Sequence, residues 1–268
     1  MFRVEIAKAL RRRRTWMLAL AIASVPVIMV VAFKLSPPSV PASADGAPFL
    51  AEIGRNGLFA ALAGLAIVQP VLLSVAAGLV SGDSIAGEAQ SGTLRYLLVR
   101  PVGRSRLVVA KYASGMAMLG ALVVVTIVVG LVAGAMAFEL GPLPTLSGTT
   151  LDMTDAIGRI IAAGLYMTVV LSGVVSIGML ISARTDNAAG ATVAAVVITI
   201  VSQILDQIGS LRALHPFLPT HGWRGFTGLF RFPIDWAPMQ DGVRVSLAYT
   251  CVFMALAVLS FRRRDVMS

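Results

Sequence analysis

The sequence predicts an all-α membrane protein with six transmembrane helices, and three observations support this fold class. Hydrophobic residues make up 57% of the 268 positions and charged residues only 13%, with a mean hydropathy of +0.86. Six runs lack Asp, Glu, Lys and Arg, and at roughly 1.5 Å per helical residue their lengths approach the thickness of a bilayer. The runs are rich in Ala, Val, Leu and Gly without alternating polar residues, which favours closely packed helices over a β-barrel.

We treat residues 1–268 as a single transmembrane domain. The predicted spans are residues 16–33, 56–82, 105–138, 160–183, 187–205 and 245–261. The basic start, the first apolar run and Ala42-Ser43-Ala44 also match the pattern of a secretory signal and its cleavage site. Because the first run is long for a signal and cleavage would leave five spans, we interpret it as a membrane span.

The distribution of Lys and Arg predicts the orientation. Of these 22 residues, fifteen lie before the first span, between the second and third, between the fourth and fifth, or after the sixth. By the positive-inside rule these segments are cytoplasmic, so we expect a multi-pass protein of the plasma membrane with both termini in the cytoplasm. The net charge of +9 then reflects membrane topology, and we expect no nucleic-acid partner.

The first 14 residues predict an amphipathic helix lying on the cytoplasmic leaflet. Phe2, Ile6, Ala9 and Leu10 fall on one face of such a helix, and the charged residues fall elsewhere. The alternative is that this basic segment only flanks the first span.

Residues 206–244, between the fifth and sixth spans, form an aromatic outer segment. Its aromatic residues include Phe217, Trp223, Phe226, Phe230, Phe232 and Trp236. Aromatic side chains of this kind lie at the level of the lipid headgroups, so we expect an interfacial or re-entrant structure, with an external lid as the alternative. His215 and His221 lie here without a cluster of carboxylates, so we expect no metal site.

Residues 83–104 form a polar, basic insert between the second and third spans. We expect Asp83 and Ser84 to cap a short helix that runs to Gln90 and that Gly92 ends. A second helical turn over residues 93–99 would expose three leucines, Leu94, Leu97 and Leu98. Because the insert is longer than a simple connection and has an apolar face, we expect it to dock a cytoplasmic partner.

The insert also carries a spaced motif. Its residues are Glu88, Gly92, Thr93, Leu94, Leu97, Leu98, Arg100, Pro101, Val102, Arg104 and Lys111. In this order they resemble the E…GTL…LL…PV.R…K segment of the type 2 membrane domains of ATP-binding-cassette (ABC) transporters. The basic start with Glu5 and Arg11 to Arg14, and the ending FRRRDV, are similar to this family more weakly. Arg95 departs from the pattern, because many members carry an acidic residue there.

This resemblance implies the permease subunit of an ABC exporter, with a hydrophobic or amphiphilic substrate such as a drug or lipid. Residues 87–103 would contain the coupling helix, and the motif residues from Glu88 to Arg104 would contact a cytoplasmic ABC ATPase subunit. Two ATPase copies and a second permease, identical or similar, would complete a dimeric transporter in the lipid bilayer. ATP and Mg would bind the ATPase, leaving this chain without a cofactor and without enzymatic activity.

Features of the sequence itself agree with an external energy source. The chain has no GxxxxGK[ST] phosphate-binding loop, and its apolar runs lack the central charged or His residues used in ion-coupled transport. The alternative function is a non-transporting membrane scaffold or sensor that recruits a cytoplasmic partner.

Four residues of the second and fifth spans are candidates for lining a substrate path. These are Ala61, Gly64, Gln69 and Gln203, where two amides occur among small residues. The alternative is that they serve helix packing and hydrogen bonding between helices.

Overall fold

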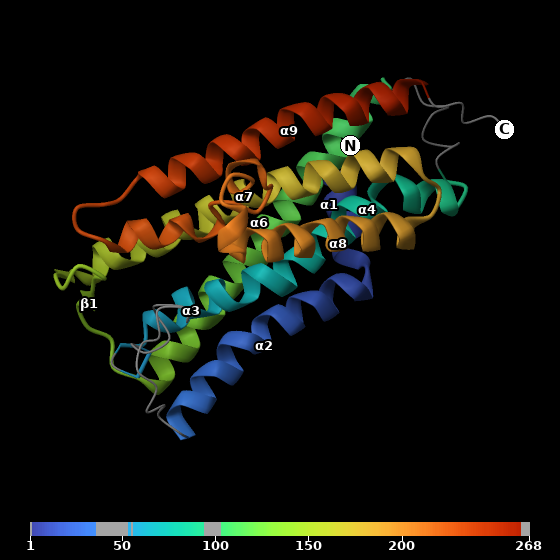
Figure 1. The fold of residues 1–268 in the computed structure, drawn as a ribbon. Helices are drawn as coiled ribbons and strands as arrows, with labels where there is room; N and C mark the ends of the chain where they lie inside the picture. The colour runs from blue at the N-terminus through green and yellow to red at the C-terminus, as the bar shows by residue number, and fades with distance from the viewer. Residues whose placement is uncertain (1, 36–52, 55, 94–102, 264–268) are drawn as a thin grey trace.

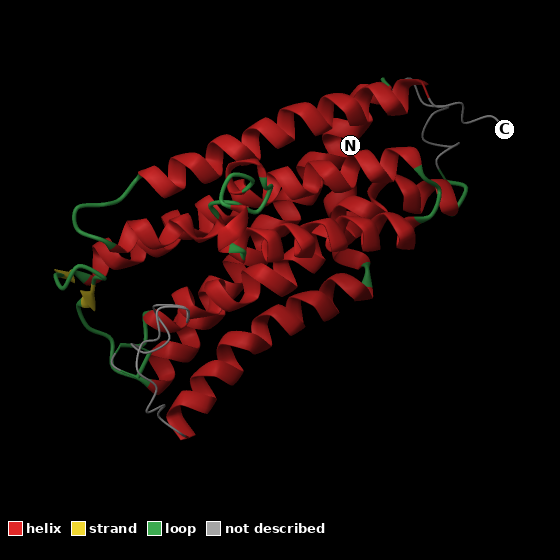
Figure 2. Ribbon diagram, viewed as in Figure 1, coloured by secondary structure: helices red, strands yellow, loops and turns green. Residues whose placement is uncertain are grey.

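The structure is a computed structural model that describes residues 2–35, 53–54, 56–93 and 103–263. In this part of the chain six helices are long and apolar enough to cross a membrane, which confirms the predicted fold class (Figure 1). Figure 2 shows how completely helix dominates. The strands found among the described residues are β1 (Leu143–Pro144) and β2 (Thr150–Leu151), which pair in an antiparallel hairpin.

Five of the six predicted spans overlap one long helix each, and the second overlaps three consecutive helical elements. A short helix, α1 (Phe2–Arg11), precedes the first span, α2 (Arg13–Leu35). The second span is a composite of α3 (Phe59–Val68), the π-helical η1 (Gln69–Leu73) and α4 (Ser74–Gln90). The remaining spans are α6 (Arg104–Ala137), α7 (Met153–Arg184), α8 (Ala188–Gln207) and α9 (Ala237–Arg263). Three 3-10 segments separate α8 from α9: η2 (Gly209–Leu211), η3 (His215–Phe217) and η4 (Trp223–Phe230).

Several helices extend beyond the uncharged runs, because a charged residue ends a run without ending a helix. One such helix is α4, which continues past residue 82 to Gln90. The expectation that Asp83 and Ser84 cap a separate helix is therefore wrong, since both lie inside α4. Gly92 does follow the helix end, and its φ of +67° is a left-handed conformation that favours glycine.

The six spans run back and forth between two ends of one bundle. Figure 1 shows α1 and the end of α4 at one end, here termed the α1 end, and β1 at the opposite, hairpin end. Arg104 donates to the carbonyl of Arg262 at 2.9 Å, which places the start of α6 beside the end of α9. The central helix is α7, which packs against α4, α6, α8 and α9. Consecutive spans thus alternate in direction, as the predicted topology requires.

The aromatic outer segment folds onto the hairpin end. Leu146 donates to the carbonyl of Phe230 at 2.8 Å, and the hydroxyl of Tyr166 on α7 donates to the carbonyl of Gly222. The segment buries three of its aromatic side chains, those of Trp223, Phe226 and Phe230. It leaves three exposed, those of Phe217, Phe232 and Trp236. The buried set attaches the segment to the bundle, and the exposed set matches side chains expected at a headgroup layer.

The same segment holds both histidines. Nδ1 of His221 lies 2.8 Å from a carboxylate oxygen of Asp206, and His215 lies farther from the same oxygen at 3.9 Å. The proximity of this carboxylate to the two histidines was not predicted from the sequence. Within the described residues, no group of three His, Cys, Asp or Glu side chains is placed to hold a metal ion.

Glycine allows α3 and α6 to approach closely. A Cβ atom at Gly130 of α6 would lie 2.6 Å from Cα of Ala61, and one at Gly134 would overlap the carbonyl of Gly57. Both approaches are much closer than ordinary van der Waals contact. Helices in membranes commonly pack through small residues in this way, because apolar burial from water contributes little there.

This packing predicts the effect of alanine at Gly130. We expect Gly130→Ala to lower stability by about 1–3 kcal/mol, because the added methyl group must displace the backbone of α3. The matched control is Gly158→Ala in α7, where a Cβ meets nothing within 4 Å. There alanine is expected to be neutral or stabilising by roughly 0.5–1 kcal/mol. Equal thermal unfolding temperatures of the two purified variants in detergent would contradict the close approach of α3 and α6.

Candidate functional site

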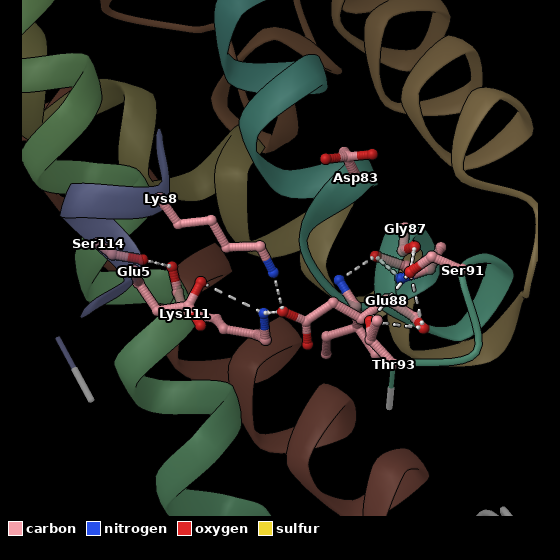
Figure 3. Close-up of polar contacts among 12 residues, drawn as sticks. Glu5, Lys8, Asp83, Gly87, Glu88, Ser91, Thr93, Lys111 and Ser114 are labelled. Atoms are coloured by element: carbon pink, nitrogen blue, oxygen red, sulfur yellow. Dashed lines mark hydrogen bonds and ion pairs between the residues drawn. The ribbon is translucent and has the colours of Figure 1, made fainter. Parts of the chain in front are cut away.

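A cluster of charged side chains lies at the α1 end, where α1, α4 and α6 meet (Figure 3). We call it the charge cluster. Its members are Glu5, Lys8, Arg12, Arg14, Asp83, Glu88 and Lys111. These residues come from three distant parts of the sequence, and they include Glu88, the first predicted coupling residue.

Glu88 is the centre of the charge cluster. Its Oε1 accepts a hydrogen bond from Nζ of Lys8 at 2.8 Å and lies 2.9 Å from Nζ of Lys111. Lys111 also lies 3.5 Å from a carboxylate oxygen of Glu5. The side chains of Glu88 and Lys111 are only 4% and 3% exposed. Because a buried charge without a partner is very costly, this pairing fixes α4 against α6.

Asp83 extends the charge cluster by one further turn of α4. One of its carboxylate oxygens pairs with Arg12 at 2.5 Å and also with Arg14, which join α4 to the junction of α1 and α2. A Cβ at Gly87 would lie 2.5 Å from the other carboxylate oxygen. Glycine at that position therefore leaves the space that the Asp83 side chain occupies.

The charge cluster sets the protonation of Lys8. Partial burial disfavours its charged form, but the hydrogen bond that Lys8 donates to Glu88 and the charges of Glu88, Glu5 and Asp83 outweigh this and raise the pKa of Lys8. A raised pKa means that this stabilisation is complete at neutral pH and is lost only as the pH rises through the folded-state value. The link between α1 and α4 is therefore present under physiological conditions.

Uncharged hydrogen bonds hold the same part of α4 to two other helices. The hydroxyl of Ser182 on α7 donates to the carbonyl of Gly82 at 2.7 Å and accepts from the N–H groups of Ile85 and Ala86 at 3.0 and 2.9 Å. At the first turn of α8, the N–H of Ala188 donates to the side-chain carbonyl of Gln90 at 3.3 Å. The last two turns of α4 are thus attached to α1, α6, α7 and α8.

The predicted coupling residues fall on both sides of a stretch that the structure does not describe. Thr93 donates to the carbonyl of Glu88 at 3.3 Å, so the turn at Gly92 folds back on α4. On the far side, Arg104 begins α6. The other predicted coupling residues, Leu94, Leu97, Leu98, Arg100 and Pro101, lie outside the described residues.

Three of the contacting residues in this site were not predicted from the sequence. Asp83 was interpreted as a helix cap, and Lys8 and Ser182 were given no role. A carboxylate at the end of an apolar run, together with a basic segment elsewhere, is a signal of pairing that could have been used for Asp83. Ser182 carried no such signal, because a hydroxyl in a span most often bonds within its own helix.

Three of the four candidate path residues, Ala61, Gly64 and Gln203, contact neighbouring helices, and the fourth, Gln69, lies in the break in the second span. A Cβ at Gly64 would lie 3.2 Å from Cβ of Pro26 on α2, and Ala61 packs on α6 as described above. A bulky residue at Gly64 would therefore disturb packing within one chain. Gln203 on α8 donates to the carbonyl of Pro70 at 3.0 Å.

This break is a π-helical turn with an identifiable cause. Pro70 has no N–H and cannot donate to the carbonyl of Ala66, four residues earlier, so it interrupts the α-helical ladder. The carbonyls of Gln69 and Pro70 accept side-chain hydrogen bonds, from Ser74 in both cases and also from Gln203 at Pro70. Gln69 lies on the same turn and is buried, and its side-chain nitrogen has no hydrogen-bond partner among the described residues. The structure thus brings Gln203 to the turn that carries Gln69, while the path itself stays a prediction.

Comparison with known proteins gives one family and two relatives. The family model described as ABC-2 family transporter protein matches residues 1–266. The chain is 28% identical over 181 residues to a protein of Stutzerimonas stutzeri named probable ABC transporter permease protein NosY, covering 65% of this chain and 58% of that protein. It is 30% identical over 110 residues to the protein of the same name from Pseudomonas aeruginosa, covering 41% of this chain and 35% of that one. The matched regions thus span less than two thirds of either relative.

The burial of the charge cluster predicts that breaking its ion pairs costs much more stability than breaking an exposed ion pair. We expect Glu88→Ala to destabilise the protein by about 3–5 kcal/mol, because Lys8 and Lys111 lose their shared partner and Lys111 stays buried. Replacing Lys111 as well, in Glu88→Ala/Lys111→Met, should recover part of this loss. The control is Asp241→Ala, which breaks an exposed pair with Arg244 and should cost less than about 1 kcal/mol. Unfolding measured in mixed micelles tests this, and equal costs for Glu88→Ala and Asp241→Ala would contradict it.

Proposed function

Because the chain belongs to the ABC-2 family of transporter proteins, we propose that it is the permease of an ATP-driven exporter for a hydrophobic or amphiphilic substrate. As a multi-pass membrane subunit of this family it is a permease and not an enzyme. ATP and Mg would be bound by a separate cytoplasmic ATPase subunit.

The observation that supports coupling to an ATPase is the attachment of the last two turns of α4. The segment between Gln90 and Arg104 joins α4 to α6, and the charge cluster and Ser182 fix those helices to their neighbours. A force applied to this segment would therefore act on several helices together. In our proposal the ATPase subunit docks on this segment, and its movement on binding ATP shifts the permease between two arrangements.

The remaining partners follow from the same proposal. Two ATPase copies would act on two permeases, the second an identical or similar chain, with the substrate route between them. Exposed apolar side chains along α8 are available for lipid or for a second chain, among them Val193, Val197, Val201 and Ile204. In this proposal the route passes the π-helical turn, where the side-chain nitrogen of Gln69 is buried without a partner among the described residues, and it selects by shape and weak polarity.

In the proposed orientation the α1 end lies in the cytoplasm. The membrane that the protein spans would be the plasma membrane. The orientation rests on the greater number of cations in the segments at the α1 end. The lipid bilayer then surrounds the six spans, and the aromatic outer segment faces the exterior.

The turn at Gly92 provides a test of coupling. Gly92→Val should reduce recovery of an ABC ATPase with the tagged chain, since a β-branched residue is strained at a φ of +67° and the docking segment would leave α4 differently. Gly103→Ala is the control at the other end of the segment, where φ is −57° and a Cβ meets nothing within 4 Å. Equal recovery of the ATPase with both variants would argue against docking at this segment. Recovery of the ATPase with the unaltered chain, together with no efflux that depends on this chain, would favour a scaffold.

The proposed orientation is tested by cysteine labelling. In a Cys251→Ala background, we expect Gly141→Cys to react with an impermeant thiol reagent added to intact cells and Gly103→Cys to react only after permeabilisation. Both positions have open space around the Cβ, so the substitutions should leave the fold unchanged. Labelling of position 103 in intact cells would reverse the orientation.

A further inference from the structure

A cavity of about 100 Å³ lies beside the charge cluster, between α1, α2, α4 and α6. One water molecule needs about 10–15 Å³ of such space, so the cavity can hold a chemical group of several atoms. Its wall is charged at the α1 end of the bundle, with residues from α1, α4 and α6, and it is apolar deeper in the bundle, where Leu18, Leu79 and Met118 contribute. This gradient suits a molecule with a polar head and an apolar tail.

Two residues that line this cavity each carry a buried side-chain oxygen that has no partner among the described residues. The first is Oε2 of Glu88, whose other oxygen is the one paired with both lysines. The second is the hydroxyl oxygen of Ser84, which lies in the next turn of α4 toward the membrane. A buried carboxylate oxygen without a donor is costly, so the site is suited to a ligand that brings hydrogen-bond donors.

The cavity also has donors to offer. Arg12 and Arg14 both line it, and each uses one guanidinium nitrogen on Asp83. A guanidinium carries five N–H donors in a planar fork, which matches the oxygens of a phosphate. The two arginine side chains are 37% and 47% exposed, so their remaining donors can be reached from the cavity mouth.

The charge of the cavity indicates the charge of the ligand. All members of the charge cluster line it, and its four cations exceed its three carboxylates by one. A ligand with one negative charge would neutralise this excess. A ligand that also carried an ammonium group would place this positive charge near those of Lys8 and Lys111, which already surround Glu88.

We propose that this cavity binds the headgroup of an anionic phospholipid with a hydroxyl-bearing headgroup, for which phosphatidylglycerol is the best match. The phosphodiester would lie at Arg12 and Arg14, and the glycerol hydroxyls would donate to Glu88 and Ser84. An acyl chain would follow the apolar wall toward Leu79. Such a lipid would join α1 to α4 whether or not the chain transports anything, so this inference does not depend on the proposed function.

The test is a lipid titration of the full-length chain in detergent, followed by native mass spectrometry. Phosphatidylglycerol, phosphatidylethanolamine and phosphatidylcholine with identical acyl chains are compared. We expect the first phosphatidylglycerol to bind at least about tenfold more tightly than either of the others, which corresponds to about 1.4 kcal/mol. Equal binding of phosphatidylethanolamine or phosphatidylcholine would overturn the proposal. Displacement of the lipid by inorganic phosphate at equal concentration would show that phosphate alone is recognised and would also overturn it.

Variants assign the binding to the cavity. Ser84→Leu should abolish the preference by filling the cavity, and Ser84→Ala should weaken it while removing no contact that the structure describes. Arg14→Gln should lower the affinity about tenfold, whereas Arg13→Gln, which removes the same charge one residue away and outside the cavity, should leave it unchanged. Thermal unfolding confirms that each variant is folded. Unchanged phosphatidylglycerol binding in folded Ser84→Leu, or equal losses in Arg13→Gln and Arg14→Gln, would overturn the site.

Discussion

The carboxylate of Glu88 is buried at the junction of three helices, and it can stay there only while its lysine partners stay with it. Lys8 comes from a helix outside the membrane spans and Lys111 from the start of α6, so one side chain determines the positions of both relative to α4. If α1 moved away, Glu88 would keep only Lys111; if α6 moved, Lys111 would lose its principal partner while remaining buried. Because separating either lysine from Glu88 leaves a buried charge unpaired, the ion pairs hold α1 and α6 to this part of α4.

Steric and hydrogen-bonding constraints act on the same two turns of α4. A Cβ at Gly82 would lie 2.5 Å from the N–H nitrogen of Thr192 on α8, and one at Gly178 of α7 would overlap the hydroxyl of Ser81. These close approaches bring Ser182 near enough to bond the backbone of α4. Small residues and charged residues thus serve one purpose here: they leave the end of α4 little freedom relative to the four helices around it.

The sequence was sufficient to predict the spans, because a run of apolar residues without charge has few alternatives to a membrane helix. The sequence was also sufficient to predict where α4 ends. A glycine after a helix often marks its end, and Gly92 does adopt a backbone conformation that other residues avoid. The sequence was insufficient for Asp83, because a charged residue following an apolar run looks like a boundary. The arginines that allow the helix to continue through Asp83 are about 70 positions away in the chain. The contact of Gln203 with Pro70 was equally hidden, since it depends on which helix packs beside the π-helical turn.

The composite second span combines a firmly attached end with a weaker middle. At the α1 end the span is an uninterrupted α-helix, and buried ion pairs hold its side chains. Disrupting these pairs is costly. At the π-helical turn Pro70 lacks the N–H that would continue the ladder, and Ser74 and Gln203 donate side-chain hydrogen bonds to the carbonyl of Pro70. Each such bond contributes only about 0.5–1.5 kcal/mol. A displacement imposed on α4 from the segment beyond Gln90 would therefore be carried as a unit through its last turns and would be absorbed first at Gln69–Leu73. That turn is also where the unpartnered amide of Gln69 is buried, so a change in helix geometry there would alter the surroundings of the most polar buried group in this part of the span.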